Sequence, residues 1–366
     1  MSANIFGFVG LGLIGGSIAR AIRERLPEST VIAYDINDVT LQTALSDGVI
    51  NVAASAIDER FTDCDYLFLC APVQKNDENL SAVKRVLSPG CLLTDVGSVK
   101  SGIHEVICSA GLESQFIGGH PMAGSERVGY LNSKAMLLEN AYYILTPTES
   151  VPQEKLETYR DLVQTLGAIP LILDYRQHDY VTAAISHLPH VIAAALVNLV
   201  RDSDSADGLM KMVAAGGFKD ITRIASSSAQ MWQQICLTNT DNIDTLLSDY
   251  IHALSEIKDK LHSRDASALY EFFDSARVYR DSFINASSGP IKKSYTITID
   301  IADEPGALAA IATILALHQI SIKNIGIVHN RESENGVLRI EFYEEASIDQ
   351  AAEILGVKGY TVYTRK

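Results

Sequence analysis

A glycine-rich turn near the N-terminus restricts the fold of this chain more than any other feature. Gly10, Gly12 and Gly15 form a GxGxxG pattern that follows the apolar run Ile5–Val9 and opens a helical stretch, 15–25. Between a strand and a helix, such glycines let a dinucleotide pyrophosphate approach the helix N-terminus. This position favours a Rossmann-type nucleotide-binding domain over an ordinary tight turn.

The following sequence alternates short apolar runs with helical stretches, as βαβ units do. We expect further strands at 31–34, 66–70 and 91–94. Together they predict an α/β domain, residues 1–171, with a parallel sheet that carries helices on its faces.

Asp35 favours NAD over NADP as the cofactor. It stands twenty residues after Gly15, at the end of the second predicted strand. A carboxylate there accepts hydrogen bonds from a ribose 2′-hydroxyl and repels a 2′-phosphate. The other expected cofactor-binding residues are Leu13 and Ile14 in the turn, and Pro72 and Val73 after the third predicted strand.

The middle of the chain has helical periodicity only. Apolar stripes at 180–200 and 243–257 predict an all-helical domain, residues 172–288, with enough apolar surface to suggest dimerisation. The small, polar segment 285–290 is typical of a linker.

The last part, residues 294–366, predicts a small α+β domain. Apolar and polar residues alternate over 295–301, as in a half-buried strand, and the turn 303–306 leads into an apolar helix that ends near 318. Strands at 320–327 and 337–343 with an Asn335-Gly336 hairpin signal, a second helix and a short last strand complete the unit.

Charge and composition exclude several classes of protein. A formal net charge of -15 disfavours nucleic acid and anionic membrane as partners, so an acidic substrate needs a local positive site. The five cysteines show no paired spacing, which favours reduced thiols. We find no signal peptide and no run long enough to span a membrane, and therefore expect a cytoplasmic protein.

His120 is the candidate general base. It lies in the segment Gly118–Glu126, which we expect to be a loop because it is too glycine-rich for a core. An exposed histidine held by Pro121 can accept a hydroxyl proton during hydride transfer, with a pKa near the ordinary value of about 6.5. A surface histidine in an ordinary turn is the alternative. Ser98 could bind the same hydroxyl or cap the next helix.

Two further histidines, His187 and His190, share one face of an apolar helix. Pro189 between them frees the carbonyl of Ile185 and should kink the helix. A pair of satisfied core histidines is one alternative. A metal pair is another, but no third ligand stands at a suitable spacing, so we expect no metal.

Arg223 follows the glycine-rich bend Gly216-Gly217, a position suited to binding a carboxylate. A plain surface charge is the alternative, and Trp232, the only tryptophan, is by default a core residue. Taken together, the glycine turn, His120 and the helical histidines suggest a nicotinamide-dependent oxidoreductase that acts on a small anionic hydroxy acid.

In these segments the chain resembles the prephenate dehydrogenase family over residues 4–285. The shared order and spacing include the glycine turn, Asp35, 95–100, 120–126, His178-Asp179, 186–190 and 220–232. The tail resembles an ACT domain, a regulatory ferredoxin-like βαββαβ module that binds amino acids, through 303–308 and 323–325.

The resemblance implies a homodimer that uses NAD to convert prephenate to 4-hydroxyphenylpyruvate in tyrosine biosynthesis. His120 would accept the hydroxyl proton, Ser98 would orient that hydroxyl, and Arg223 would bind a substrate carboxylate. The other implied substrate-binding residues are His187, His190 and Ser125, with Glu126 and Asp220 in an ionic network near the entrance and Trp232 closing the site from its own subunit or its neighbour.

The resemblance also implies that L-tyrosine binds the tail and inhibits the enzyme. The implied effector-binding residues are Asp303, Pro305, Gly306, Ala307, Leu308, Asn324 and Ile325. Three alternatives stay open: an arogenate or cyclohexadienyl dehydrogenase, an ACT-regulated 2-hydroxyacid dehydrogenase, and a catalytically silent amino-acid sensor. The presence of His120, Ser98 and Arg223 argues against the silent sensor.

Overall fold

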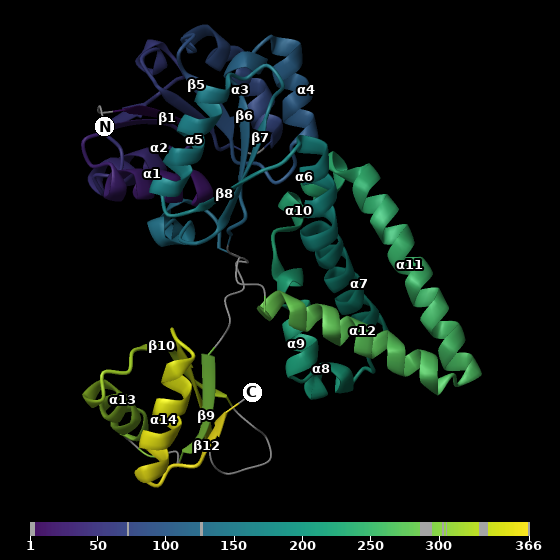
Figure 1. Ribbon diagram of the computed structural model, residues 1–366. Helices are drawn as coiled ribbons and strands as arrows, with labels where there is room; N and C mark the ends of the chain where they lie inside the picture. The colour runs from purple at the N-terminus through teal and green to yellow at the C-terminus, as the bar shows by residue number, and fades with distance from the viewer. Residues whose placement is uncertain are drawn as a thin grey trace. The chain divides into compact units, whose positions relative to one another are not determined.

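The computed structural model describes residues 4–71, 73–124, 127–285, 295–301, 304, 306–328 and 336–364 (Figure 1). The chain divides into two compact units, residues 1–259 and 260–366. Five residues expected to bind ligands lie outside the described residues: Pro72, Ser125, Glu126, Asp303 and Pro305.

A five-stranded parallel sheet forms the base of the first unit, with the order β3-β2-β1-β4-β5. Its strands are β1 (Ile5–Val9), β2 (Thr30–Tyr34), β3 (Val52–Ala54), β4 (Tyr66–Leu69) and β5 (Leu92–Asp95). The predicted parallel sheet is therefore confirmed. Strand β3 was not expected, because three residues are too few to show a periodic pattern.

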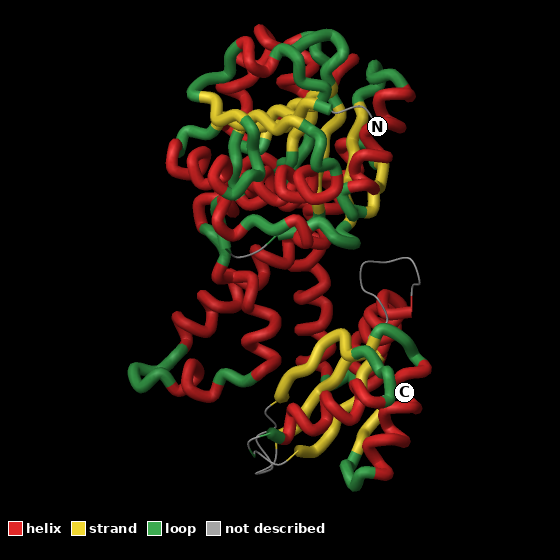
Figure 2. Tube along the Cα trace, turned by 90° about the vertical axis from the view of Figure 1, so that its left-hand side faces the viewer, coloured by secondary structure: helices red, strands yellow, loops and turns green. Residues whose placement is uncertain are grey.

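Both faces of this sheet are buried, which explains its continuous apolar runs. In β4, Tyr66 and Phe68 belong to one apolar cluster, whereas Leu67 and Leu69 belong to another. Helices contribute further residues to the two clusters. Figure 2 shows helices beside the strands of this unit. They are α1 (Leu13–Arg25), α2 (Asp38–Ser46), α3 (Val73–Val86), α4 (Ser101–Ala110) and α5 (Gln153–Thr165).

A second, three-stranded sheet follows, with β6 (Ile117–Pro121) antiparallel to β7 (Tyr142–Pro147) and β7 parallel to β8 (Ile169–Ile172). The expectation that His120 lies in an exposed loop is wrong: His120 is a half-buried residue of β6. A Cβ atom on Gly119 would come within 2.6 Å of the Asp95 carbonyl oxygen, and one on Gly118 within 2.3 Å of the Thr146 Oγ1. The glycines are thus core residues that permit close packing.

Residues 174–285, all of them described, form helices and no strand, as expected. The α-helices are α6 (Tyr175–Thr182), α7 (Leu188–Ser203), α8 (Leu209–Val213), α9 (Gly216–Thr222), α10 (Ala229–Thr238), α11 (Thr240–Ser263) and α12 (Ala266–Asn285). Short 3-10 turns occur at η1 (Glu59–Phe61), η2 (Glu113–Gln115), η3 (Tyr130–Asn132), η4 (Ala135–Leu137) and η6 (Arg223–Ser226).

The irregularity expected near Pro189 takes the form of a π-helical turn, η5 (Ala183–His187), between α6 and α7. Proline lacks an N–H and cannot donate to the preceding turn, and a π-helical turn accommodates such a break without ending the helix. The turn carries His187 at its end.

The expectation that no run is long enough to span a membrane is corrected by the continuous helical stretch Tyr175–Ser203. The stretch has 29 residues and contains an 18-residue window with a mean hydropathy of 1.6, which is sufficient, by length and composition alone, to cross a membrane. However, its first turns bury His178 and Asp179, which hydrogen-bond to residues of β6 and α4. These contacts attach the start of the stretch to the nucleotide-binding domain, whereas 17% of its apolar window is buried.

The second unit contains an antiparallel sheet of order β10-β11-β9-β12. Alternate residues of its first strand, Ile297, Ile299 and Ile301, are buried, which confirms the predicted period of two. Its elements are β9 (Tyr295–Ile301), α13 (Ala307–Leu317), β10 (Ile322–Val328), β11 (Gly336–Phe342), α14 (Ala346–Val357) and β12 (Val362–Thr364).

Helix α4 packs against β7 and α6 through a buried histidine. The His104 Nε2 lies 3.0 Å from the Thr146 Oγ1, and its ring stacks on Tyr175 at 4.4 Å between centroids. Burial is the main cause that lowers the pKa of His104 to about 4. His104 is thus neutral in the folded protein at neutral pH.

This burial makes stability depend on pH. The folded pKa lies below the unfolded value of about 6.5, so the unfolded chain binds the extra proton and the stabilisation is lost as pH falls from 6.5 toward 4. In His104→Gln, the slope of unfolding free energy against pH between 6 and 5 should decrease by about 1.2 kcal/mol per pH unit, measured by urea unfolding. The exposed His252→Gln variant is the control. Equal slopes in all three proteins would contradict the assignment.

Candidate active site

The glycine turn packs closely against the end of β4. Gly10 has a φ of +95°, and a Cβ atom there would lie 2.6 Å from the Ala71 nitrogen. A Cβ atom on Gly15 would lie 2.8 Å from the Gly10 carbonyl oxygen. Neither position accommodates a side chain without a shift of the backbone.

Gly12 differs from these two glycines, since a Cβ atom there would meet nothing within 4 Å. It is the N-cap of α1, and no side chain caps this helix end. The open space beside the helix N-terminus therefore fits a dinucleotide pyrophosphate, which the backbone amides and the helix dipole can bind. Leu13 and Ile14 begin the same helix, and Val73 begins α3.

Asp35 directly follows β2, as expected, and its carboxylate also supports the turn. Its Oδ2 accepts a hydrogen bond from the Leu11 nitrogen at 2.7 Å, and its Oδ1 accepts one from the Asn37 nitrogen at 2.9 Å. Removing this carboxylate would therefore disturb the glycine turn in addition to any contact with a ribose.

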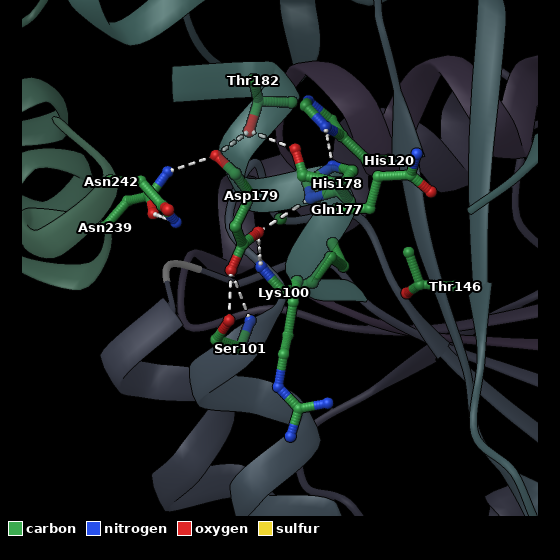
Figure 3. Close-up of polar contacts among 12 residues, drawn as sticks. Lys100, Ser101, His120, Thr146, Gln177, His178, Asp179, Thr182, Asn239 and Asn242 are labelled. Atoms are coloured by element: carbon green, nitrogen blue, oxygen red, sulfur yellow. Dashed lines mark hydrogen bonds and ion pairs between the residues drawn. The ribbon is translucent and has the colours of Figure 1, made fainter. Parts of the chain in front are cut away.

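A chain of three side chains extends from β6 into α6 (Figure 3). The His120 Nδ1 lies 2.8 Å from the His178 Nε2, and the His178 Nδ1 lies 2.8 Å from the Asp179 Oδ1. His178 and Asp179 are buried, with 0% and 1% of their surfaces exposed. The candidate base is therefore connected to a buried carboxylate.

Asp179 also binds the N-terminal end of α4. It accepts hydrogen bonds from the Lys100 nitrogen at 2.7 Å, and from the Ser101 nitrogen and hydroxyl at 2.8 and 2.6 Å. Burial raises the pKa of Asp179, but the hydrogen bonds from His178, Ser101 and the two backbone amides outweigh this effect and hold the pKa below its ordinary value. Asp179 is thus an ionised acceptor.

The ionised carboxylate determines where the protons of both histidines lie. Because Asp179 only accepts, the His178 Nδ1 carries a proton, and burial lowers the pKa of His178 despite this hydrogen bond. The neutral His178 then has a lone pair on Nε2, which accepts from the His120 Nδ1. The remaining nitrogen of His120, Nε2, carries a lone pair and can accept a proton.

The expectation of an ordinary pKa for His120 is wrong. Burial is the main cause that lowers the pKa of His120 well below 6.5, and the positive charges of His178, Lys100 and His187 would lower it further. His120 is therefore neutral, and able to act as a base, over a wider pH range than an exposed histidine.

A buried ion pair fixes the strand that carries His120. The fully buried Lys100 donates from Nζ to the Asp95 Oδ2 and, at 2.7 Å, to the Gly119 carbonyl oxygen. The Asp95 Oδ1 accepts from the Gly119 nitrogen at 3.2 Å. Ser98 is half-buried nearby in sequence, but it does not cap α4, whose N-cap is Lys100 without a side-chain cap.

Two of the helical residues expected at the site, His187 and His190, contact Trp232. The His190 ring stacks on the indole at 3.6 Å, and the His187 ring meets it edge-on at 6.0 Å. Burial is the main cause that lowers the pKa of His190, and the charge of Arg223, which is exposed in η6, lowers this pKa further. Asp220 is exposed at the end of α9.

Four residues of this site have no role that the sequence alone predicts. His178 and Asp179 belong to a segment shared with the resembled family, and neither Lys100 nor Asn239 stands out in the sequence. The adjacent His178 and Asp179 in a helical stretch are a usable sequence signal for a buried polar site, since a buried carboxylate needs hydrogen-bond donors. Nothing in the sequence shows that Lys100 is buried beside Asp95.

A Rossmann-type domain joined to a half-buried histidine that contacts a buried His–Asp pair is the arrangement expected of a dinucleotide-dependent dehydrogenase. Family models for the prephenate dehydrogenase nucleotide-binding domain and dimerization domain match residues 18–170 and 174–275. The chain belongs to the prephenate dehydrogenase family.

Similar proteins include the prephenate dehydrogenases of Bacillus subtilis, 38% identical over 94% of both chains, and Lactococcus lactis, 34% identical over 95% of this chain and 96% of the relative. Two solved structures are similar to this chain, and each is 30% identical to it in sequence. They are A. aeolicus prephenate dehydrogenase with hydroxyphenyl propionate and NAD+ (TM-score 0.72; 77% of this chain, 99% of that chain) and Synechocystis arogenate dehydrogenase (TM-score 0.69; 76% and 100%).

The environments of Gly10 and Gly12 predict different defects, a loss of stability at Gly10 and a loss of NAD binding at Gly12. Gly10→Ala should destabilise the fold by about 3 kcal/mol, because the new Cβ atom strains a left-handed residue and meets the backbone of Ala71. Gly12→Ala should leave the melting temperature within about 1 °C of the wild type but weaken NAD binding at least about tenfold, since its methyl group enters the space for the pyrophosphate. Calorimetry measures both quantities. Tight NAD binding by Gly12→Ala would contradict this cofactor site.

Proposed function

We propose that this protein is an NAD-dependent prephenate dehydrogenase of tyrosine biosynthesis, located in the cytoplasm. The observation that carries the proposal is the Asp179–His178–His120 chain, which leaves a lone pair on the His120 Nε2. Family membership and the open pyrophosphate space beside Gly12 support the choice of substrate and cofactor.

The His120 Nε2 would accept the proton of the substrate 4-hydroxyl group as hydride leaves the carbon that bears it. Bound NAD supplies the hydride acceptor. His178 and Asp179 would hold the imidazole in the tautomer that can accept this proton. The resulting dienone is a vinylogous β-keto acid, so loss of carbon dioxide restores aromaticity without further help from the protein.

The residues around Trp232 would bind the rest of the substrate. Arg223 would bind a carboxylate, His190 would contribute a polar contact, and Ser98 would hydrogen-bond the reacting hydroxyl group. The Trp232 Nε1 is buried and, within the described part of the chain, has no hydrogen-bond partner, which leaves it available to a ligand or a second subunit. Glu126 and Asp220, with Ser125, would complete the site near its entrance.

A homodimer is part of the proposal. The matched dimerization domain carries large apolar side chains that are exposed in the single chain. Among them are Ile185, Leu199, Met212, Val213 and Leu237, each at least 60% exposed. Covering such a surface is a sufficient reason for two chains to associate.

The second unit is proposed to contain an ACT domain that binds L-tyrosine. Its βαββαβ order and sheet order β10-β11-β9-β12 are those of a ferredoxin-like fold. Gly306, with a φ of +96°, precedes α13, where Ala307 and Leu308 begin the helix. Asn324 and Ile325 are exposed on the edge strand β10, where an amino acid and a second domain could both reach them.

The first test compares substrates and the His120→Asn variant. Wild-type protein should form NADH from prephenate and NAD+, with a rate that has already reached its plateau at pH 6.5, because the pKa of His120 is lowered. His120→Asn should lose about 10²- to 10⁴-fold in kcat with nearly unchanged binding, since it cannot accept the proton.

Parallel assays with arogenate and NADP+ identify the alternative specificities. Higher kcat/KM for arogenate would make the protein an arogenate dehydrogenase, a specificity named for the Synechocystis structure. Near-normal turnover by His120→Asn would remove His120 from the mechanism.

The second test concerns the tail. In the full chain, Asn324→Ala should raise the tyrosine concentration needed for half-inhibition about tenfold or more, because a contact to the amino group is lost, and should leave uninhibited turnover unchanged. The neighbouring exposed Ser321→Ala variant is the control. Tyrosine inhibition that is purely competitive with prephenate and insensitive to Asn324→Ala would place tyrosine in the active site instead.

A further inference from the structure

Asn239 connects the candidate active site to the junction of α10 and α11. Its side chain is 4% exposed, and its Nδ2 lies 2.8 Å from the Asp179 carbonyl oxygen and 3.1 Å from the His187 Nδ1. Its Oδ1 accepts a hydrogen bond from the Asn242 Nδ2 at 2.8 Å (Figure 3). One amide therefore contacts three partners.

These partners determine the orientation of the Asn239 amide. A backbone carbonyl can only accept, so the atom that faces Asp179 must be the NH2 group. The bond from Asn242 to Oδ1 agrees with this orientation. The second hydrogen of the same NH2 group is then available to the His187 Nδ1.

The amide in turn determines the tautomer of His187. Its Nδ1 accepts from Asn239, so the ring proton lies on Nε2. Burial is the main cause that lowers the pKa of His187 to about 4, which keeps the ring neutral. In the described part of the chain, the hydrogen bond of the His187 ring is the one at Nδ1. The Nε2–H is therefore available to donate to a bound molecule.

His187 lies close to the reacting groups. It ends the π-helical turn, meets the Trp232 ring edge-on, and is near enough that its charge would lower the pKa of His120. A neutral N–H donor at this position suits an oxygen that needs no countercharge, such as a hydroxyl or carbonyl oxygen.

We propose that Asn239 is a positioning residue that fixes His187 as the Nε2–H tautomer, and that His187 thereby donates a hydrogen bond to a hydroxyl or carbonyl oxygen of the substrate. This inference rests on the proposed function for the identity of the substrate. The tautomer itself follows from the contacts of Asn239 alone and can be measured without turnover.

The ¹⁵N resonances of the His187 ring in the full-length protein test the tautomer directly. We expect Nε2 to be protonated and Nδ1 to be unprotonated in the wild type, and 4-hydroxyphenylpyruvate with NAD to shift the Nε2–H resonance. A protonated Nδ1 would overturn the proposal. An Nε2–H resonance that does not respond to 4-hydroxyphenylpyruvate would overturn the substrate contact.

Asn239→Asp reverses the hydrogen bond to His187, because a carboxylate can only accept from Nδ1. The single ring proton of neutral His187 then lies on Nδ1 and no longer on Nε2. We expect about a tenfold loss of kcat/KM for prephenate, the scale of one hydrogen bond together with an unpaired partner. Asn242→Ala removes a bond of Asn239 without touching His187 and should retain the Nε2–H resonance.

A double-mutant cycle separates positioning from structural damage. His187→Gln provides an amide donor that has no tautomers, so adding Asn239→Asp to it should cost less than about threefold in kcat/KM. An equal tenfold loss in both backgrounds would assign Asn239 a structural role and overturn the proposal. If the wild type fails to oxidise prephenate, the proposed function fails, while the ¹⁵N result still decides the tautomer.

Discussion

The carboxylate of Asp179 is the interaction on which the site depends. It accepts from two backbone amides and a hydroxyl group at the start of α4, and from His178 in its own helix. These donors offset the cost of burying a negative charge, which a single partner would not do. The same carboxylate therefore joins α6, the first helix of the helical domain, to the start of α4 in the nucleotide-binding domain, and it orients His178 next to His120. The packing of α6 on α4 and the orientation of the candidate base share one set of hydrogen bonds.

Much of the nucleotide-binding domain could be predicted because its strands are buried on both faces and its glycine turn has a fixed spacing. The sequence could not show that β6 is a strand, since Gly118 and Gly119 have low strand propensity and their role depends on Asp95 and Thr146, distant in sequence. The partners of His120 were also hidden, because they come from another element. The residues around Trp232 were easier to group, as His187 and His190 share a helix face.

Two histidines of the candidate site are oriented by different neighbours. His120 receives its orientation from a carboxylate through His178, whereas His187 contacts the amide of Asn239. Both chains meet at Asp179, since Asn239 donates to its backbone carbonyl and His178 to its side chain. Burial lowers the pKa of both rings, so both are neutral, and the hydrogen bonds of their neighbours determine which nitrogen of each ring carries the proton.

The lowered pKa of His120 also bears on any proton that this ring takes up. Burial and the neighbouring positive charge of Lys100 both disfavour the imidazolium ion, which is therefore more acidic than that of an exposed histidine. If His120 is the base, as proposed, its imidazolium ion returns a captured proton more readily than an exposed histidine would. The environment that lowers the basicity of His120 thus favours the return of the ring to its neutral form.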